Sequence, residues 1–320
     1  MWWFGCFLLL ASVALALYGL TAYFFWYAIR RKRRRPLSLQ NPRLTQEQRR
    51  YLEENERAKE YVRALPGKED WSLQSWDGLA LHALYIPAPW PSRRAMVLVH
   101  GYGSTGLDEY ARFVRFYHEL GFHLLLPDNR AHGQSEGKYI GFGWLDRPDL
   151  LDWIGRLIAR LGADCRIGLH GISMGAAAVM MVGGDPGLPG NVRAIVEDCG
   201  YTSVQQEFIF QLRQLMHIPT WPILPLTDAY CRYKAGFGFQ EASALDQVRR
   251  VSVPMLFIHG DADRFVPTEM VYPLFEACAS PQKELFLVPG AVHACAYAQD
   301  QARYEARVRA LLQAAGLLQA

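Results

Sequence analysis

Residues 166–175 read Arg-Ile-Gly-Leu-His-Gly-Ile-Ser-Met-Gly, and the expected architecture of the chain is built around them. Its first half is a short apolar run that predicts a buried strand, and the alanine-rich run 176–181 predicts a helix. Between them, Gly171 and Gly175 flank Ser173 at two residues on either side. Glycines at these places let a strand and a helix pass closely around a strained residue. The stretch therefore predicts a sharp turn that presents the serine hydroxyl at a helix N-terminus, where developing negative charge is favoured.

The pentapeptide alone also fits a tight connection with no chemical role, so its meaning depends on the rest of the chain. Apolar runs that predict strands lie at 71–76, 79–86, 95–100, 123–127, 166–170, 192–196, 253–259 and 285–288. Stretches that predict helices lie at 107–120, 144–162, 174–183, 267–278 and 297–316. Asp77-Gly78 predicts a two-residue hairpin between the first two strands. This alternation predicts an α/β fold with a doubly wound, mostly parallel sheet, whose site lies at the carboxyl ends of the strands.

The composition of the 320-residue chain fits one large domain with appendages. Its six cysteines show no C-x-x-C spacing, which favours free thiols over a disulfide framework or a zinc site. The net charge of +3 arises from residues 30–35, which are all basic. Without these six, 28 basic residues stand against 31 acidic ones. The charge therefore gives no support to nucleic-acid binding.

Residues 2–29 carry no charged side chain, and a membrane-spanning helix needs about 20 apolar residues. Aromatic residues cluster at both ends of this run, as at the two membrane interfaces. A cleaved signal peptide is the alternative, but no positive residue precedes the run, and the run is too long. We therefore expect residues 1–29 to be a retained, single-pass anchor in the cell membrane. The basic residues 30–35 predict that the rest of the chain faces the cytoplasm.

The remaining chain divides into a connector and a main domain. We expect residues 30–66 to be a basic flank and a helical connector, with a helix over about 45–64. Residues 67–320 form the expected main domain. Within it, residues 201–246 carry more apolar side chains than a connection needs and predict two helices, which we interpret as a lid over the site. The alternative is an insertion that only packs on the domain.

A serine hydroxyl attacks at neutral pH only with a base beside it and a carboxylate that orients the base. Asp263 follows the strand at 253–259, and His293 follows the last strand. Both therefore come after Ser173, in the order Ser, Asp, His that a sheet of this kind uses. Asp261 competes for the role of the acid, but Val266-Pro267 starts the next helix and leaves Asp263 in the loop. Ser173, Asp263 and His293 are the predicted catalytic residues.

The loop that follows the third strand, His100 to Gly106, is rich in glycine. It does not match the phosphate-binding pattern G-x-x-x-x-G-K-[ST]. It fits instead a loop whose backbone stabilises an oxyanion, with the N–H groups of Tyr102 and Met174 as the two donors. We expect His100 to brace this loop and His132 to be structural.

Other polar residues near these loops have simpler interpretations. Asp128 and Arg130 are expected to hold their own loop by local hydrogen bonds. Asp146, Asp149 and Asp152 have the spacing of a helix start and an exposed face, so we expect caps and solvated charges there and no metal site.

Together these residues resemble the α/β-hydrolase superfamily, and in particular bacterial membrane-anchored α/β hydrolases with one N-terminal span and a short helical lid. The matching motifs are His100-Gly101-Tyr102-Gly103, Asp128 to Gly133, Gly171 to Gly175, His259 to Asp263 with Val266-Pro267, and His293. The resemblance covers about residues 70–320. Many relatives carry glycine where this chain has Ala131, in a loop next to the site.

The resemblance implies a serine hydrolase that cleaves an ester or thioester through an acyl-enzyme, with no cofactor and no metal. The implied partners are a small acyl ester substrate and the membrane, with no nucleic acid. A serine peptidase or acyl-peptide hydrolase with the same three residues is an alternative. A membrane-tethered interaction domain without catalysis is another. The sequence indicates neither acyl chain length nor oligomeric state, and it does not separate hydrolysis from acyl transfer.

Overall fold

The computed structural model describes residues 2–31, 39, 41 and 44–319. In this part of the chain eight strands form one sheet in the order β1-β2-β4-β3-β5-β6-β7-β8. The strands are β1 (Glu69–Gln74), β2 (Ala80–Ile86), β3 (Arg94–Val99), β4 (His123–Pro127), β5 (Arg166–Ile172), β6 (Val192–Asp198), β7 (Met255–Gly260) and β8 (Lys283–Val288). Strand β2 runs antiparallel to β1 and β4, and the other pairs are parallel. The predicted mostly parallel, doubly wound sheet is confirmed.

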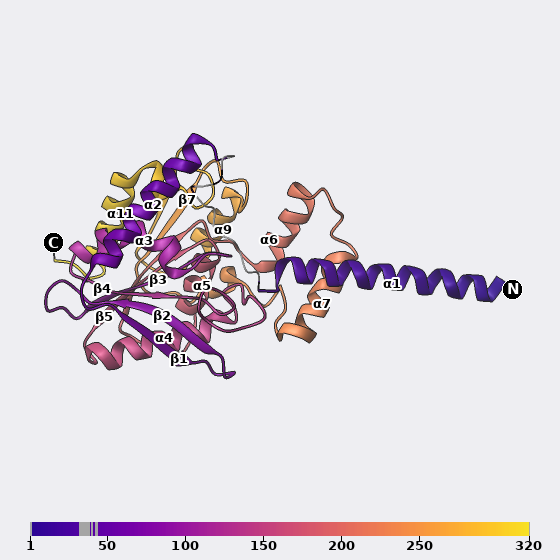
Figure 1. Ribbon diagram of the computed structural model, residues 1–320, viewed down its shortest axis with the longest axis horizontal. Helices are drawn as coiled ribbons and strands as arrows, with labels where there is room; N and C mark the ends of the chain where they lie inside the picture. The colour runs from indigo at the N-terminus through magenta and orange to yellow at the C-terminus, as the bar shows by residue number, and fades with distance from the viewer. Residues whose placement is uncertain (1, 32–38, 40, 42–43, 320) are drawn as a thin grey trace.

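Helices cover both faces of the sheet (Figure 1). They are α1 (Trp2–Ala28), α2 (Gln46–Ala64), α3 (Gly106–Glu119), α4 (Asp146–Leu161), α5 (Met174–Gly183), α6 (Val204–Phe210), the π-helix η1 (Gln211–Leu215), α7 (Ile223–Ala235), α8 (Ala244–Val248), the 3₁₀-helix η2 (Thr268–Met270), α9 (Val271–Ala277), α10 (Ala296–Gln299) and α11 (Gln301–Ala314). The predicted helices are found, including those of the insertion at residues 201–246, with boundaries that differ by a few residues. The role of this insertion as a lid stays a prediction, and it is called the lid below.

Alternation along the central strands divides the core between the two faces. Ala95, Val97 and Val99 of β3 pack into one apolar cluster with helices α4, α5, α8 and α9. Met96 and Leu98 point the other way, into a second cluster with α3 and α11. Both faces of the sheet are therefore buried, which explains why its strands read as continuous apolar runs.

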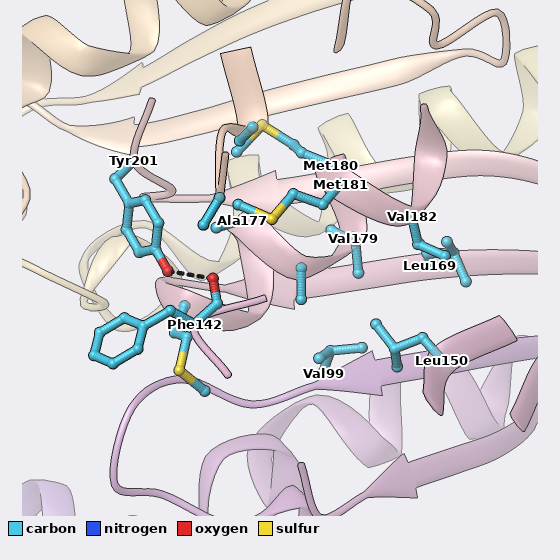
Figure 2. Packing of buried hydrophobic residues seen from close by; sticks show 14 of the residues in the cluster. Val99, Phe142, Leu150, Leu169, Ala177, Val179, Met180, Met181, Val182 and Tyr201 are labelled. Atoms are coloured by element: carbon cyan, nitrogen blue, oxygen red, sulfur yellow. Dashed lines mark hydrogen bonds between the residues drawn. The ribbon is translucent and has the colours of Figure 1, made fainter. Parts of the chain in front are cut away.

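Helix α5 lies at the centre of the first cluster, and every one of its residues is buried. Figure 2 shows Met180 and Met181 of this helix packed among neighbouring side chains, near the hydrogen bond that the Tyr201 hydroxyl donates to the Phe142 carbonyl at 2.9 Å. Because α5 is held on all sides, the turn that leads into it at Ser173 is fixed as well.

The connection between β1 and β2 corrects one detail of the sequence prediction. The strands pair as a hairpin, but the connection runs over residues 75–79 and is longer than the two residues Asp77-Gly78. The Ser75 hydroxyl oxygen accepts a hydrogen bond from the Leu79 N–H at 2.8 Å, and the Ser75 N–H donates to the Leu79 carbonyl at 2.9 Å. The serine thus closes a wider loop, in which Gly78 has the expected positive φ of 85°.

Helix α1 extends away from the domain, and α7 of the lid lies along its inner part (Figure 1). Within the described residues it is the one helix long and apolar enough to cross a membrane, and a signal sequence shares these properties. Its C-terminal end is built into the domain, where Phe25 and Ile29 are fully buried. Lys32 to Arg35 of the basic flank lie outside the described residues.

The expected connector helix α2 packs on α3. The guanidinium groups of Arg112 and Arg115 lie 4.4 Å from the ring centres of Tyr51 and Tyr61. Val62 is buried in the second apolar cluster. The division of the chain after residues 29 and 66 stays a prediction, but α1 and α2 both contact the sheet-bearing domain.

Candidate active site

The turn at Ser173 has the strain that its glycines predict. Ser173 lies at φ 57° and ψ −117°, a region that side-chain-bearing residues rarely occupy. A Cβ on Gly171 would lie 2.1 Å from the Gly175 carbonyl oxygen, and a Cβ on Gly175 would lie 1.9 Å from the Val99 carbonyl oxygen. No side chain fits at either place, so both glycines are required for β5 to pass directly into α5.

The structure brings Ser173, His293 and Asp263 together in one chain of hydrogen bonds. The Ser173 hydroxyl lies 2.9 Å from Nε2 of His293, and Nδ1 of His293 lies 2.7 Å from Oδ2 of Asp263. The three residues follow β5, β8 and β7, so they meet at the carboxyl edge of the sheet. Asp261 lies outside this chain and instead accepts a hydrogen bond from the Gly290 N–H. The arrangement can move a proton from the hydroxyl to the imidazole.

Asp263 is held in its ionised form by its surroundings. Burial would raise its pKa, but hydrogen bonds from His259 and His293 outweigh this effect and lower the pKa to about 2. The other carboxylate oxygen accepts hydrogen bonds from the N–H groups of Phe265 and Val266, at 2.8 and 3.0 Å. Asp263 is therefore a fixed negative charge that can stabilise a protonated His293.

His259 is a part of this site that the sequence reasoning missed. Its Nε2 lies 3.0 Å from the Val266 carbonyl oxygen and 3.4 Å from Oδ2 of Asp263. The ring is fully buried at the end of β7. The available signal was its place in an otherwise apolar strand, four residues before Asp263. A polar ring buried there needs a partner, and the loop that carries Asp263 supplies two.

The residues of the predicted oxyanion donors lie at the cavity beside Ser173. Tyr102 and Met174 line the same cavity as the serine, and a Cβ on Gly101 would lie 3.2 Å from the serine Cβ. His100 braces this loop, as expected: its ring contacts the Gly101 carbonyl at 2.7 Å and accepts from the Asn129 N–H at 2.9 Å. The roles of the Tyr102 and Met174 N–H groups stay predictions.

His132 also supports this loop and does not reach the serine. Its Nε2 accepts a hydrogen bond from the Gly103 N–H at 3.0 Å. Burial lowers the pKa of His132 to about 3, so the ring is neutral and keeps the lone pair that this bond requires. The expectation that His132 is structural agrees with this arrangement.

The expectation of solvated charges near α4 is wrong for two aspartates. Asp149 is buried and accepts two hydrogen bonds, each 2.8 Å long, from Arg130. Asp146 is buried as well and accepts from the Gly143 N–H. Arg130 also contacts Asp77 in the β1–β2 connection, at 3.0 Å, so its bonds are not only local. The aspartates face inward because the buried guanidinium needs charged partners.

An apolar cavity of about 190 Å³ adjoins Ser173. Its walls come from the end of α1, the lid and the loops beside the serine. Lining residues include Phe24, Tyr27, Ala28, Tyr102, Phe142, Ser173, Met174, Tyr201, Glu207, Phe208, Leu212, Met216, Ile223, Leu224 and Phe265. An apolar cavity of about 150 Å³ binds benzene in another protein, so this one has room for a hydrophobic group.

Glu207 of α6 is the one carboxyl group among the described residues that line the cavity. One of its oxygens accepts from Nε2 of Gln211 at 2.6 Å, and the other is buried without a partner. Burial raises the pKa of Glu207 to about 8, so the carboxyl is largely neutral at pH 7. No local pattern in the sequence marks Glu207, because only the packing of the lid brings it to the cavity beside the serine.

Cys199 forms with Asp263 and His293 the one cluster in the described part of the chain that has the spacing of a metal site. Its thiol does not fit a metal, because burial raises its pKa well above the ordinary value, and a metal binds the thiolate. Asp263 and His293 already bond each other. These residues are better explained by the hydrogen-bond chain than by metal binding.

Comparison with known proteins places this geometry in context. A family model described as serine aminopeptidase, S33, matches residues 225–300, which include Asp263 and His293 but not Ser173. The uncharacterised protein YqkD of Bacillus subtilis is 28% identical over 228 residues, which are 71% of this chain and 74% of that protein. The uncharacterised protein YfhR of Escherichia coli K12 is 27% identical over 240 residues, or 72% and 77% of the two chains.

Solved structures share the fold at low identity. The Pyrococcus furiosus esterase Pf2001 superposes with a TM-score of 0.62 at 22% identity, over 77% of this chain and 90% of that one. The monoacylglycerol lipase of Paleococcus ferrophilus superposes with a TM-score of 0.54 at 21% identity, over 72% and 98%. The sheet order and these likenesses show that the chain has the α/β-hydrolase fold, and its residues 225–300 match a family model of that kind.

Proposed function

We propose that this protein is a serine hydrolase that cleaves carboxylic esters or thioesters through an acyl-enzyme formed on Ser173. The observation that carries the proposal is the unbroken chain of hydrogen bonds from Ser173 through His293 to Asp263. The strained turn supports it, because strain of this kind persists where the surrounding structure holds a group for chemistry. The substrate is a small molecule with an apolar acyl group, since the cavity beside the serine is lined mainly by apolar residues.

The proposed reaction proceeds in two halves. The Ser173 oxygen attacks the acyl carbonyl carbon while Nε2 of His293 takes the hydroxyl proton, and Asp263 stabilises the imidazolium that results. The N–H groups of Tyr102 and Met174 stabilise the oxyanion. His293 then gives its proton to the leaving alcohol or thiol, and the acyl-enzyme remains. In the second half, water gives a proton to His293 and attacks the acyl carbon. The bond between the acyl carbon and the Ser173 oxygen then breaks, His293 returns the proton to that oxygen, and the acid is released.

The proposal places the enzyme in the cell membrane as a single-pass protein with a cytoplasmic domain. Retention of α1 is supported by its contacts, because cleavage behind it would remove Phe25 from the core. The orientation rests on the basic residues 30–35, which follow the apolar run directly. An anchored enzyme with an apolar cavity suits lipophilic acyl substrates at the membrane.

The test is hydrolysis of p-nitrophenyl esters from acetate to palmitate by the full chain in detergent. The full chain is needed because the end of α1 lines the cavity. We expect turnover that Ser173→Ala abolishes, and labelling of Ser173 by a fluorophosphonate. If the intact chain is neither active nor labelled, the proposal fails, and a membrane-tethered interaction domain becomes the better account.

An aminopeptidase or acyl-peptide hydrolase is the second candidate. It is favoured by the description of the matched family model and by Glu207, since a carboxylate in the cavity can bind a substrate amino group. The raised pKa of Glu207 weakens this candidate, because a neutral carboxyl attracts a cation poorly. Turnover of aminoacyl p-nitroanilides at the rate of the esters, lost in Glu207→Gln, would favour the peptidase over the esterase.

A further inference from the structure

The last two turns of α1 are part of the cavity that adjoins Ser173. Phe24, Tyr27 and Ala28 line it together with lid residues. The end of the helix is fixed in this place, because the Tyr102 hydroxyl donates to the Ala28 carbonyl at 3.0 Å and the Ile140 N–H donates to the Ile29 carbonyl at 2.8 Å. Helix α1, which the sequence predicts to be a membrane anchor, therefore also forms one wall of the substrate cavity.

The lid reaches along the same helix toward the membrane. The ring of Tyr230 in α7 lies 5.0 Å from the ring of Phe25 and 6.1 Å from that of Tyr18. Residues 2–17 precede these contacts and span about 24 Å as a helix. The hydrocarbon core of a bilayer is about 30 Å thick. If α1 crosses the bilayer, Tyr18 and its lid neighbour lie at or inside the boundary of the hydrocarbon.

The exposed side chains of the lid suit that position. Trp221 and Tyr233 are each 78% exposed, and Leu215 and Leu226 are 45% and 38% exposed. Tryptophan and tyrosine favour the membrane interface, where the ring is apolar on one side and wet on the other. Large exposed apolar side chains on one insertion are unfavourable in water but favourable against lipid. The lid and α1 thus offer one apolar surface toward the membrane.

We propose that a fatty acyl chain of a membrane lipid reaches Ser173 directly from the bilayer, along the surface that α1 and the lid form together. This inference rests on the proposed ester hydrolysis and names its substrate class as an ester lipid that resides in the bilayer. The acyl chain stays in apolar surroundings from the bilayer to the cavity, so its methylene groups are not exposed to water on the way. The side chains of Phe24 and the small Ala28 set the length of chain that the cavity accepts.

One test measures how α1 residues that line the cavity affect the preference for acyl chain length. Ala28→Trp places a large ring in the cavity, and we expect the ratio of kcat/KM for palmitate to that for butyrate esters to fall roughly tenfold. Ala14→Trp adds the same ring on an exposed part of α1 away from the cavity and should leave the ratio unchanged. Phe24→Ala removes a ring that lines the cavity, which enlarges the cavity and should raise the ratio. A wild-type ratio in both Ala28→Trp and Phe24→Ala would overturn the proposal.

A second test measures the position of the lid without any activity. The full chain is placed in phosphatidylcholine vesicles that carry brominated acyl chains, which quench nearby tryptophan. Lipid quenches Trp2, Trp3 and Trp26 of α1 in every variant, so we expect Trp221→Phe to remove only one component of the quenching, whereas Trp90→Phe, in the β2–β3 connection, should keep that component. Equal quenching in Trp221→Phe and the unchanged protein would overturn the membrane-facing lid. Absence of ester hydrolysis together with loss of the component in Trp221→Phe would refute only the proposed function.

Discussion

The hydroxyl of Tyr102 donates a hydrogen bond to the carbonyl oxygen of Ala28, and this 3.0 Å contact joins the loop beside Ser173 to the last turn of α1. The two residues are 74 positions apart in the sequence. The carbonyl is at a helix end, where no intrahelical donor is available, so the phenol satisfies a group that would otherwise need water. This hydrogen bond therefore holds the end of α1 against the loop beside Ser173.

Removal of this link should weaken the fold by a small amount. Tyr102→Phe keeps the ring and deletes the hydroxyl, and we expect the free energy of unfolding to fall by about 1 kcal/mol. Thermal unfolding of the full chain in detergent measures the change. Tyr233→Phe is the matched control, because Tyr233 is largely exposed on the lid. An equal effect in both variants would contradict a structural role for the contact with Ala28.

The turn at Ser173 should tolerate no side chain at Gly175. Gly175→Ala puts a Cβ 1.9 Å from the Val99 carbonyl, so β3 and α5 must separate. We expect loss of folded protein, or a loss of stability of about 3 kcal/mol or more. Gly155→Ala in α4 is the control, since a Cβ there meets nothing within 4 Å and should stabilise the helix by about 0.5–1 kcal/mol. Chemical unfolding of both variants checks the contrast.

Catalysis should depend more on the negative charge of Asp263 than on the shape of its side chain. Asp263→Asn keeps the size of the group but removes the negative charge that stabilises protonated His293. In a serine protease the same change lowers kcat by about 10⁴, and we expect a loss of that order here. Steady-state kinetics on a p-nitrophenyl ester measures it. Asp261→Asn is the control outside the hydrogen-bond chain, and a larger loss in that variant would contradict the choice of Asp263.

Two buried glutamates should make the protein less stable as the pH rises. Burial raises the pKa of Glu197 and of Glu207 to about 8, from an ordinary 4.5. Between these values the unfolded chain releases protons that the folded chain keeps, so stability falls as the pH increases from 4.5 to 8. The slope is at most about 1.4 kcal/mol per pH unit for each group.

Glutamine substitutions test this pH dependence. Glu197→Gln and Glu207→Gln should each reduce the fall in the free energy of unfolding with pH. The stability of each variant relative to the unchanged protein should therefore increase as the pH rises. Urea unfolding at pH 5, 6, 7 and 8 measures the slopes. Glu136→Gln, at an exposed position, controls for a general effect of charge. Parallel slopes in all four proteins would show that neither carboxyl keeps its proton on folding.

Local signals in the sequence predict the sheet and the three residues that meet at Ser173. The glycines around Ser173 are needed by the turn itself, and Asp263 and His293 follow strands whose ends must meet in a parallel sheet. The structure adds that these side chains reach hydrogen-bonding distance. Such signals suffice because strand order and turn chemistry are encoded within a few residues.

Contacts between distant segments could not be predicted in this way. Asp149 is expected at the surface from its helical spacing, yet Arg130 draws it into the core. Glu207 and Ala28 come to the cavity only because the lid and α1 pack there. No periodicity within either segment carries that information. The sequence also misplaces the hairpin connection at residues 75–79, because the Ser75 side chain closes a wider loop than Asp77-Gly78 suggests.

Covalent labelling of the full chain with a fluorophosphonate, followed by peptide mass analysis, shows directly whether Ser173 is the nucleophile. We expect one adduct, on the peptide that contains Ser173, formed as fluoride leaves and lost in Ser173→Ala. We also expect much slower labelling in Asp263→Asn. An unlabelled Ser173, or labelling that persists in Ser173→Ala, would contradict the claim that this serine is the nucleophile.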